Sequence, residues 1–257
     1  MISVISIIAR NTFREAVRDR VLYNLVLFVL LITASAIFLG ELTAGQEART
    51  IVNFGLSAML IFGAFIAIFV GVSLVSKEIE RRTIYAIFSK PIGRGEFIVG
   101  KYCGLCLTLL VNVLIMGVGV SIAILSVDGG RLAFTIWGAI FLIFLELMIL
   151  TAVAILFSSF SSPALSALLT LFIFVIGHFS QSLRDFAANL GSSFTKLFFE
   201  ILYYALPNLS FYSFVTNAAH GDAPSLAMIG GAVGYALAYV FVLQVIAIAI
   251  FKRRNFK

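Results

Sequence analysis

The residue of this sequence with the clearest chemical potential is Glu146, a single acid inside the apolar run Phe141–Met148. An ionised side chain at the centre of a bilayer costs on the order of 3 kcal/mol. We therefore expect Glu146 to face other helices and to have a polar partner, such as Asn112 or Gln244. These three residues are candidates for a translocation pathway. The role of Glu146 is either that of a pathway or proton-linked residue or that of one half of an interhelical hydrogen bond.

A second pattern is Cys103-Gly104-Leu105-Cys106, which has the C-x-x-C spacing of metal and redox sites. Such sites need further ligands or a surrounding that favours the thiolate. The two histidines, His178 and His220, are expected at the opposite side of the membrane, with His178 at the outer end of its span. We therefore expect the cysteines to be packing residues and predict no metal site.

A third pattern is Gly95–Lys101, which matches G-x-x-x-x-G-K, the start of a phosphate-binding loop. A true loop of this kind follows a strand and continues with Ser or Thr, which reaches the magnesium ion. Tyr102 stands at that position here, and the glycines lead into an apolar run. We therefore interpret the motif as a chance match, and we predict that this chain binds no cofactor and is not an enzyme.

The composition is that of an integral membrane protein. Of the 257 residues, 61% are hydrophobic and 12% are charged, whereas soluble domains are nearer one half and one quarter. The net charge of +6 comes from basic residues at the ends of apolar runs, which argues against a nucleic-acid partner. The apolar start at Met1–Ala9 precedes its charges, so we predict no cleavable signal.

About 20 apolar residues are needed to cross the hydrocarbon core of a bilayer as a helix. Six runs qualify, which predicts a single all-α, six-span membrane domain over 1–257. They are 22–40, 51–75, 98–125, 132–158, 163–180 and 227–251. Gly230, Gly234 and Ala238 recur at every fourth residue of the last span, as in helices that pack closely.

The orientation follows from the distribution of Lys and Arg. Fourteen lie on the side of the N-terminal segment, the connection after span two and the tail, against four on the other side. Basic residues favour the cytoplasmic side. We therefore predict that both termini lie inside, in the cytoplasmic (inner) membrane of a bacterium.

Two further segments have the pattern of helices that lie in the plane of the membrane. About 3–20 has an apolar stripe beside Arg10, Arg14 and Arg18, which suits the inner surface. The outer segment, about 181–225, contains an apolar stripe from Ser193 to Ala205 that is too short to cross, so we expect an interfacial or re-entrant helix there.

The connection between spans two and three predicts a short, rigid helix over about 77–90. Pro91 ends it, and Gly93 and Gly95 make the turn into span three. A partner could push on such a helix, although an ordinary charged hairpin would have the same pattern. The predicted contact residues are Glu78, Glu80, Arg81, Arg82, Thr83, Tyr85, Ile87, Phe88 and Lys90.

The run Ser76–Lys101 resembles the coupling-helix region of bacterial ATP-binding-cassette exporter permeases of the type-two kind. More narrowly, it looks like the branch that includes the permease for nitrous-oxide reductase maturation. The features that carry the resemblance are two acids, Thr, an apolar pair, Lys-Pro, an aromatic residue and Gly-Lys. They fall on Glu78 and Glu80, Thr83, Ile87 and Phe88, Lys90-Pro91, Phe97 and Gly100-Lys101.

The segment Arg10–Arg20 is similar to the elbow helix of this family, and 193–214 to its re-entrant helices. The resemblance implies a permease paired with a second copy of itself or a related chain. It also implies two cytoplasmic ATPase subunits docked on the coupling helices. It identifies no substrate, and two rival functions stay open: a membrane scaffold that anchors an ATPase, and an ATP-independent carrier.

Overall fold

The computed structural model describes residues 2–17, 27–28, 31, 45–80, 92–180, 197, 200–201, 203 and 206–253. Every regular element among these residues is helical. In chain order the elements are α1 (Ile2–Ala16), α3 (Glu47–Phe65), η2 (Ile66–Val70), α4 (Gly71–Glu80), α6 (Arg94–Leu125), α7 (Gly130–Ser158), α8 (Pro163–His178), η3 (Leu209–Tyr212), α11 (Val215–Ala219) and α12 (Leu226–Arg253). The all-α prediction is confirmed for this part of the chain.

Four helices are long and apolar enough to cross a membrane: Glu47–Glu78, Arg94–Leu125, Gly130–Ser158 and Leu226–Arg253. They correspond to predicted spans two, three, four and six. Predicted span one, 22–40, lies almost entirely outside the described residues. Predicted span five, 163–180, is not confirmed as a full crossing: α8 has 16 residues, or about 24 Å at 1.5 Å per residue.

The first of these long helices contains a π-helical turn. The turn, η2, joins α3 to α4 without a break in the helix. Ser73, in the first turn of α4, donates a hydrogen bond from Oγ to the carbonyl oxygen of Val70, the last residue of η2, at 3.0 Å. Turns of this kind are local irregularities that often occur at functional sites.

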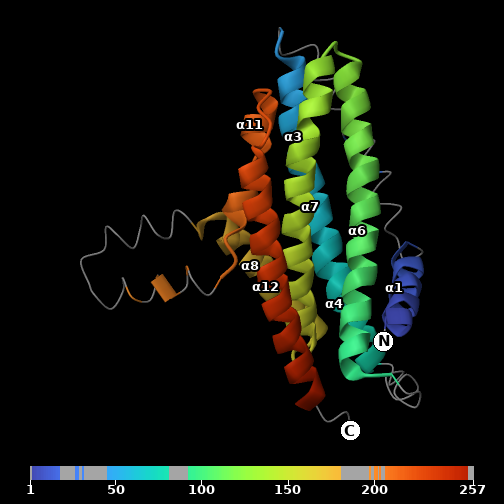
Figure 1. Cartoon of the computed structure of the whole chain (residues 1–257). Coiled ribbons are helices and arrows are strands. Elements are labelled where there is room, and N and C mark those ends of the chain that lie inside the picture. The colour runs from blue at the N-terminus through green and yellow to red at the C-terminus, as the bar shows by residue number, and fades with distance from the viewer. Residues whose placement is uncertain are drawn as a thin grey trace.

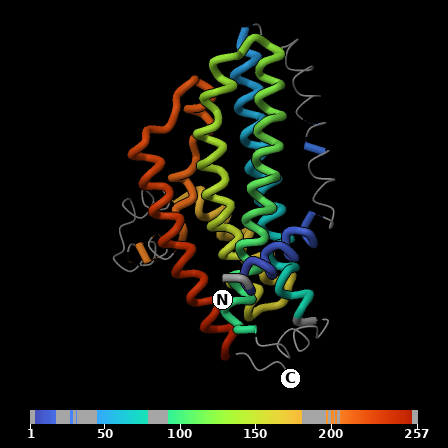
Figure 2. Tube along the Cα trace, turned by 45° about the vertical axis from the view of Figure 1, so that its right-hand side comes forward, coloured from blue at the N-terminus to red at the C-terminus, as the bar shows by residue number. Residues whose placement is uncertain are grey.

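The long helices form an upright bundle (Figure 1). The tube in Figure 2 shows α6 and α7 as an antiparallel pair joined at the upper end, with α1 crossing the lower end of α6. In both views α8 accompanies only the lower part of α7, and α11 lies near the upper end. The short α8 and the residues after Pro207 therefore share the length that one crossing helix would have covered.

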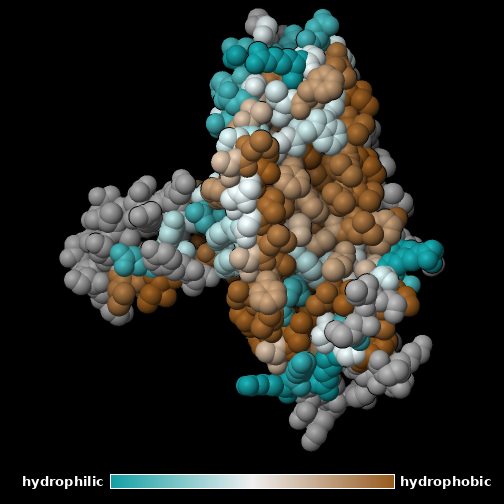
Figure 3. All heavy atoms as spheres, in the orientation of Figure 1, coloured by the Kyte–Doolittle hydropathy of each residue, from teal (hydrophilic) through white to brown (hydrophobic). Residues whose placement is uncertain are grey.

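Apolar side chains fill the bundle and also cover its sides. One buried cluster joins α3, η2, α6 and α7, and a second joins α6, α7 and α12. On the face in Figure 3, hydrophobic residues form a broad middle zone between hydrophilic ends. This is the surface expected of a bundle whose solvent is lipid.

The small-residue stripe of α12 does not pack closely against the described part of the chain. A methyl group added at Gly230 or Gly234 would meet no other atom of the described chain within 4 Å, and the neighbouring Phe241 is 70% exposed. The expected close packing is instead made by other glycines. A Cβ at Gly63 would fall 2.5 Å from Leu147, and one at Gly138 would fall 2.5 Å from Pro224.

Candidate functional site

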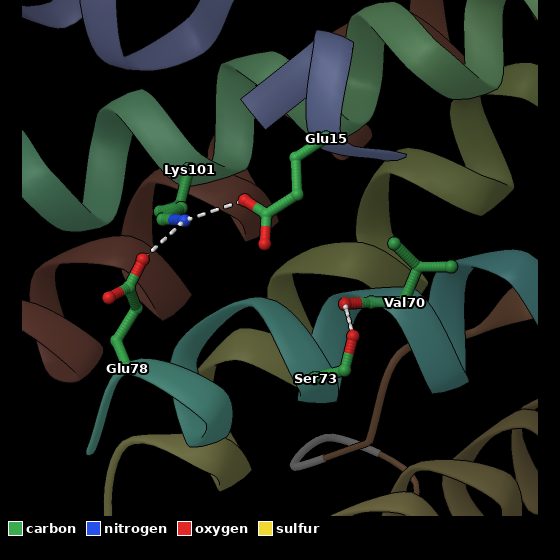
Figure 4. Close-up of polar contacts among 5 residues, drawn as sticks. All are labelled: Glu15, Val70, Ser73, Glu78 and Lys101. Carbon is green, nitrogen blue, oxygen red and sulfur yellow. Dashed lines mark hydrogen bonds and ion pairs between the residues drawn. The ribbon is translucent and has the colours of Figure 1, made fainter. Parts of the chain in front are cut away.

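A buried lysine joins three helices at the lower end of the bundle. Lys101 of α6 is 5% exposed, and its Nζ lies 3.4 Å from Glu15 Oε2 of α1 and 3.3 Å from Glu78 Oε1 of α4. Figure 4 shows the two carboxylates approaching the ammonium group from different helices. We call these three residues the lysine junction.

Glycines in α6 bring α1 close enough to complete the junction. A Cβ at Gly100 would lie 2.7 Å from Cβ of Ile8, and one at Gly104 would lie 2.6 Å from the carbonyl oxygen of Ala9. Only glycine permits such an approach of two helices. Gly100 and Lys101 are therefore a packing residue and an ion-pair residue inside a continuous helix, which agrees with the prediction that Gly95–Lys101 is no phosphate loop.

Aromatic and capping contacts extend the junction to α12. Lys101 Nζ lies 5.7 Å from the ring centroid of Phe97, a cation–π distance. The Phe97 ring in turn stacks on Phe251 of α12 with centroids 5.8 Å apart. Arg94 donates to the carbonyl oxygens of Phe251 and Lys252 at 3.2 and 2.8 Å, which satisfies the end of α12. The lower ends of α1, α4, α6 and α12 are thus connected.

The predicted coupling helix meets this junction at its first residues. Glu78 is a junction member, and Glu80 is the last residue of α4. The remaining predicted contact residues, Arg81, Arg82, Thr83, Tyr85, Ile87, Phe88 and Lys90, lie outside the described residues, as does the side chain of Glu80. Their role stays a prediction. The lysine junction contains residues from both sides of this segment, because α4 precedes the segment and α6 follows it.

A second polar site lies inside the bundle. Glu146 of α7 is 1% exposed, as its cost in lipid requires. Its Oε1 lies 3.3 Å from Nε2 of His178, the last residue of α8. The contact has the distance of an ion pair without the alignment of a hydrogen bond, and neither carboxylate oxygen has another hydrogen-bond partner in the described chain.

This contact corrects two expectations. The partner of Glu146 is neither Asn112 nor Gln244. Asn112 Nδ2 donates instead to the carbonyl oxygen of Thr108 at 2.7 Å, and neither polar atom of Gln244 has a hydrogen-bond partner among the described residues. His178 was expected at the outer end of span five. It lies beside the middle of α7 instead, because α8 ends there.

A network of hydroxyl groups adjoins the Glu146–His178 pair. Ser180 and Ser210 each donate to Asn208 Oδ1 at 2.6 Å. The amide N–H of Asn208 donates to the Tyr235 hydroxyl at 3.0 Å, and Tyr212 donates to the carbonyl oxygen of Ala232 at 2.9 Å. These bonds attach the residues after Pro207 to both α8 and α12.

The cysteines give no sign of a metal centre. Cys103 is exposed and Cys106 is buried, and both are free thiols. Within the described ranges, no group of three or more His, Cys, Asp or Glu side chains is placed to hold a metal ion.

Comparison with known proteins identifies the family. Residues 6–256 match the family model described as ABC-2 family transporter protein. The chain belongs to the ABC-2 transporter family. As an ABC-2 permease, it is a membrane protein of a kind that is not itself catalytic.

Two curated relatives of this ABC-2 permease carry the same description, "Probable ABC transporter permease protein NosY". The protein from Stutzerimonas stutzeri is 27% identical over 135 residues, 51% of this chain and 49% of the relative. The protein from Pseudomonas aeruginosa is 28% identical over 127 residues, 48% of this chain and 46% of the relative. The matches therefore span about half the length of the curated relatives.

Sequence reasoning missed the two partners that complete these sites. Glu15 was seen only as part of an elbow-like segment, and His178 as a residue of the outer side. A signal existed for Glu15, since Lys101 is a cation just inside an apolar helix and requires a counter-ion. The pairing of His178 depends on where α8 ends along α7. The apolar run 163–180 does not give that position.

Proposed function

We propose that this ABC-2 permease is the membrane subunit of an ATP-driven exporter, moved by a separate ATPase on its inner face. The observation that carries the proposal is the lysine junction. A partner that displaces the segment 81–93 pulls on Glu78 and Lys101 together, and through Glu15 on α1. Family membership supports the same function.

A movement of the lysine junction would be passed into the bundle along two continuous helices. Glu78 is near the end of an unbroken helix of 32 residues that begins at Glu47. Lys101 is near the start of α6, which has the same length. The π-turn at Ile66–Val70 is the place where the first of these helices would bend, because its hydrogen bonding already departs from the α pattern.

The proposed orientation places the lysine junction at the cytoplasmic surface of a bacterial inner membrane. The excess of Lys and Arg on that side supports it. In this orientation α1 is the elbow helix, with Arg10 and Arg14 toward anionic headgroups. Both ends of the described chain then lie inside.

The proposed assembly contains two ATPase subunits, which hold ATP and Mg²⁺, and two permease chains. Each ATPase would dock on the 77–90 helix of one permease. The exposed apolar faces of the bundle would face lipid and the second permease. Family membership is what supports this assembly and the outward direction of transport.

Two other functions make different predictions. A scaffold that anchors an ATPase would bind the partner without moving any cargo. An ATP-independent carrier would need no partner, and the buried Glu146–His178 pair is the observation that favours it, since ion-driven carriers place ionisable groups inside the membrane. Only one such pair is present among the described residues, and the lysine junction has no use in a carrier of that kind.

Reconstitution separates these functions. Tagged permease would be purified from its native membrane and its co-purifying proteins identified, and the complex would then be placed in lipid nanodiscs. We expect an ATPase of the cassette type whose turnover depends on the permease. Capture of the ATPase with turnover equal to that of the free subunit would favour the scaffold, and repeated failure to capture any ATPase would favour the carrier.

A further inference from the structure

The Glu146–His178 pair has a defined hydrogen-bond polarity. His178 Nδ1 lies 3.0 Å from the carbonyl oxygen of Phe174, and a carbonyl oxygen can only accept. Nδ1 therefore carries a proton and donates it. The Phe174 ring packs edge-on against the imidazole with centroids 4.8 Å apart, which helps to hold the ring in this orientation. Nε2 is the nitrogen that remains for Glu146.

The number of protons between Nε2 and Oε1 follows from this polarity. With none, a lone pair would face an ionised carboxylate that is 1% exposed and has no other hydrogen-bond partner among the described residues. With two, an imidazolium would face a neutral acid and lack a counter-ion. One proton would serve both Oε1 and Nε2, which lie 3.3 Å apart, once a small rotation of the carboxyl group aligns them. In an apolar interior the neutral arrangement, with the acid donating to Nε2, avoids the desolvation of two charges.

Neighbouring ionisable groups do not change this count. Along α7 and α8 the side chains next to the pair are apolar or hydroxyl-bearing, and η2 has no ionisable residue. The charged residues of α3, α4, α6 and α12 lie toward the ends of those helices. Glu47 and Arg49 open α3, Lys77 and Glu78 are near the end of α4, Arg94, Glu96 and Lys101 open α6, and Lys252 and Arg253 end α12.

The remaining ionisable neighbours are phenols and thiols. Tyr212 of η3 is the phenol near Glu146, and its hydroxyl already donates to the carbonyl oxygen of Ala232. Tyr235 and Tyr239 of α12 stack on each other. On α6, Tyr102 donates to the carbonyl oxygen of Met148 beside Cys103 and Cys106. α11 has no ionisable side chain.

We propose that Glu146 and His178 form a proton-binding site that fastens α8 to α7, so that separation of the two helices releases the proton above neutral pH. The ligand is a single proton, shared between Oε1 and Nε2. This inference goes beyond the permease role, because it assigns a ligand to residues that the lysine junction does not use.

The direction of the pH dependence follows from counting protons in the separated state. In water a carboxylic acid ionises near pH 4.3 and an imidazolium near pH 6.5, both approximate values. Between about these pH values the separated groups also bind one proton in total, on the imidazole, so the stability of the pair is independent of pH. Above about pH 6.5 the separated groups bind less than one proton, and the paired state loses stability by up to about tenfold per pH unit.

Thermal and chemical unfolding of the purified permease tests the site without any ATPase. The Glu146→Gln variant supplies an amide N–H to Nε2 in place of the acid proton, but cannot release it. Relative to Glu146→Gln, wild type should lose stability between pH 6.5 and 8.5 by up to about 100-fold in the unfolding equilibrium. Parallel pH profiles for the two proteins would overturn the proposal.

The His178→Gln variant gives a prediction that a purely structural role would not. Glu146 would then be the only group to ionise on separation, so the pH dependence should begin near about pH 4.3 instead of 6.5. The double variant Glu146→Gln/His178→Gln should show neither onset. An unchanged onset in His178→Gln would also count against the site.

Infrared spectroscopy of wild-type protein covers the case in which the variants do not fold. At pH 7.5 a carboxyl group in water is ionised, so a carboxylic acid C=O band at that pH reports the protonated Glu146. Its absence would refute the shared proton. A link between this proton and transport rests on the proposed function, and is measured separately as the pH profile of permease-dependent ATP turnover; a flat profile beside an intact infrared band would reject the link and keep the site.

Discussion

Lys101 Nζ lies 3.3 Å from Glu78 Oε1, and this contact joins the start of α6 to the last turns of α4. Both helices lead to the connection that we expect an ATPase to grip. The same ammonium group reaches Glu15 of α1. A single buried cation therefore links three helices at this end of the bundle.

Replacement of Lys101 by Met should destabilise the permease. Two partly exposed carboxylates would lose the cation that they share, and the ion-paired contact between α1, α4 and α6 would be lost. Since Glu15 is 43% and Glu78 20% exposed, solvent screening keeps the expected loss to about 1–3 kcal/mol of unfolding free energy. Chemical unfolding in detergent measures it.

The matched control is Arg253→Met, which removes an exposed cation from the same end of the bundle. The combined variant Lys101→Met/Glu78→Gln should recover part of the loss, because it removes a charge that Lys101 no longer neutralises. Equal stability of Lys101→Met and Arg253→Met would show that the junction contributes nothing measurable.

Replacement of Gly104 by Ala should displace α1 from α6. The new methyl carbon would fall 2.5 Å from Cβ of Thr12 and 2.6 Å from the carbonyl oxygen of Ala9, and a backbone atom cannot move aside without moving its helix. We expect a lower melting temperature and faster proteolysis of α1.

The control for this change is Gly119→Ala on the same helix. Apart from the backbone of its own helix, no atom of the described residues lies within 4 Å of a methyl group added there, and alanine is favoured over glycine in a helix by up to about 1 kcal/mol. Gly119→Ala should thus be neutral or stabilising. Equal effects of the two substitutions would contradict the close approach of α1.

Reversal of charge at Arg81 and Arg82 should release the ATPase. Both residues belong to the predicted docking helix, and the substitution to Glu replaces attraction by repulsion toward an acidic partner surface. Affinity capture from detergent-solubilised membranes measures the loss. The control is the pair Lys252→Glu and Arg253→Glu, which changes charge equally at the end of α12. Capture that survives at Arg81 and Arg82 would move the docking site elsewhere.

Replacement of Tyr212 by Phe should loosen the attachment of η3 to α12. The hydroxyl donates to the carbonyl oxygen of Ala232 at 2.9 Å, and the Tyr212 side chain is buried. Loss of this bond should cost about 0.5–1.5 kcal/mol of unfolding free energy. Amide hydrogen exchange around Leu209–Tyr212 should rise before exchange in α7 does, and an unchanged pattern would argue that the bond is dispensable.

Several features of the fold could be read from the residues alone. Runs of about 20 apolar residues must be helical in lipid, because no water is present to satisfy the backbone. For this reason predicted spans two, three, four and six agree with the long helices to within several residues. The burial of Glu146 followed from the same reasoning, since the energetic cost of an exposed acid in lipid does not depend on which helices surround it.

The same reasoning is not confirmed for the fifth apolar run, because the helix within this run is shorter than the run itself. The run 163–180 looks like a crossing, but α8 ends at His178, where the residues after Pro207 pack against it. A Cβ at Gly177 would lie 2.8 Å from Leu209, so a segment 32 residues further along the chain occupies the space beside this helix end. Hydropathy is blind to such a contact because lipid and protein interiors are equally apolar.

What the sequence determined by itself is the class of molecule: a helical membrane bundle, a strongly basic end, and one acid that must be hidden from lipid. Tertiary structure alone decided the partners, pairing Glu146 with His178 and Lys101 with Glu15 and Glu78. The physical reason is that burial and periodicity are properties of one helix. A partner depends on where another helix begins, ends and crosses, and these positions come from packing across long separations in the chain.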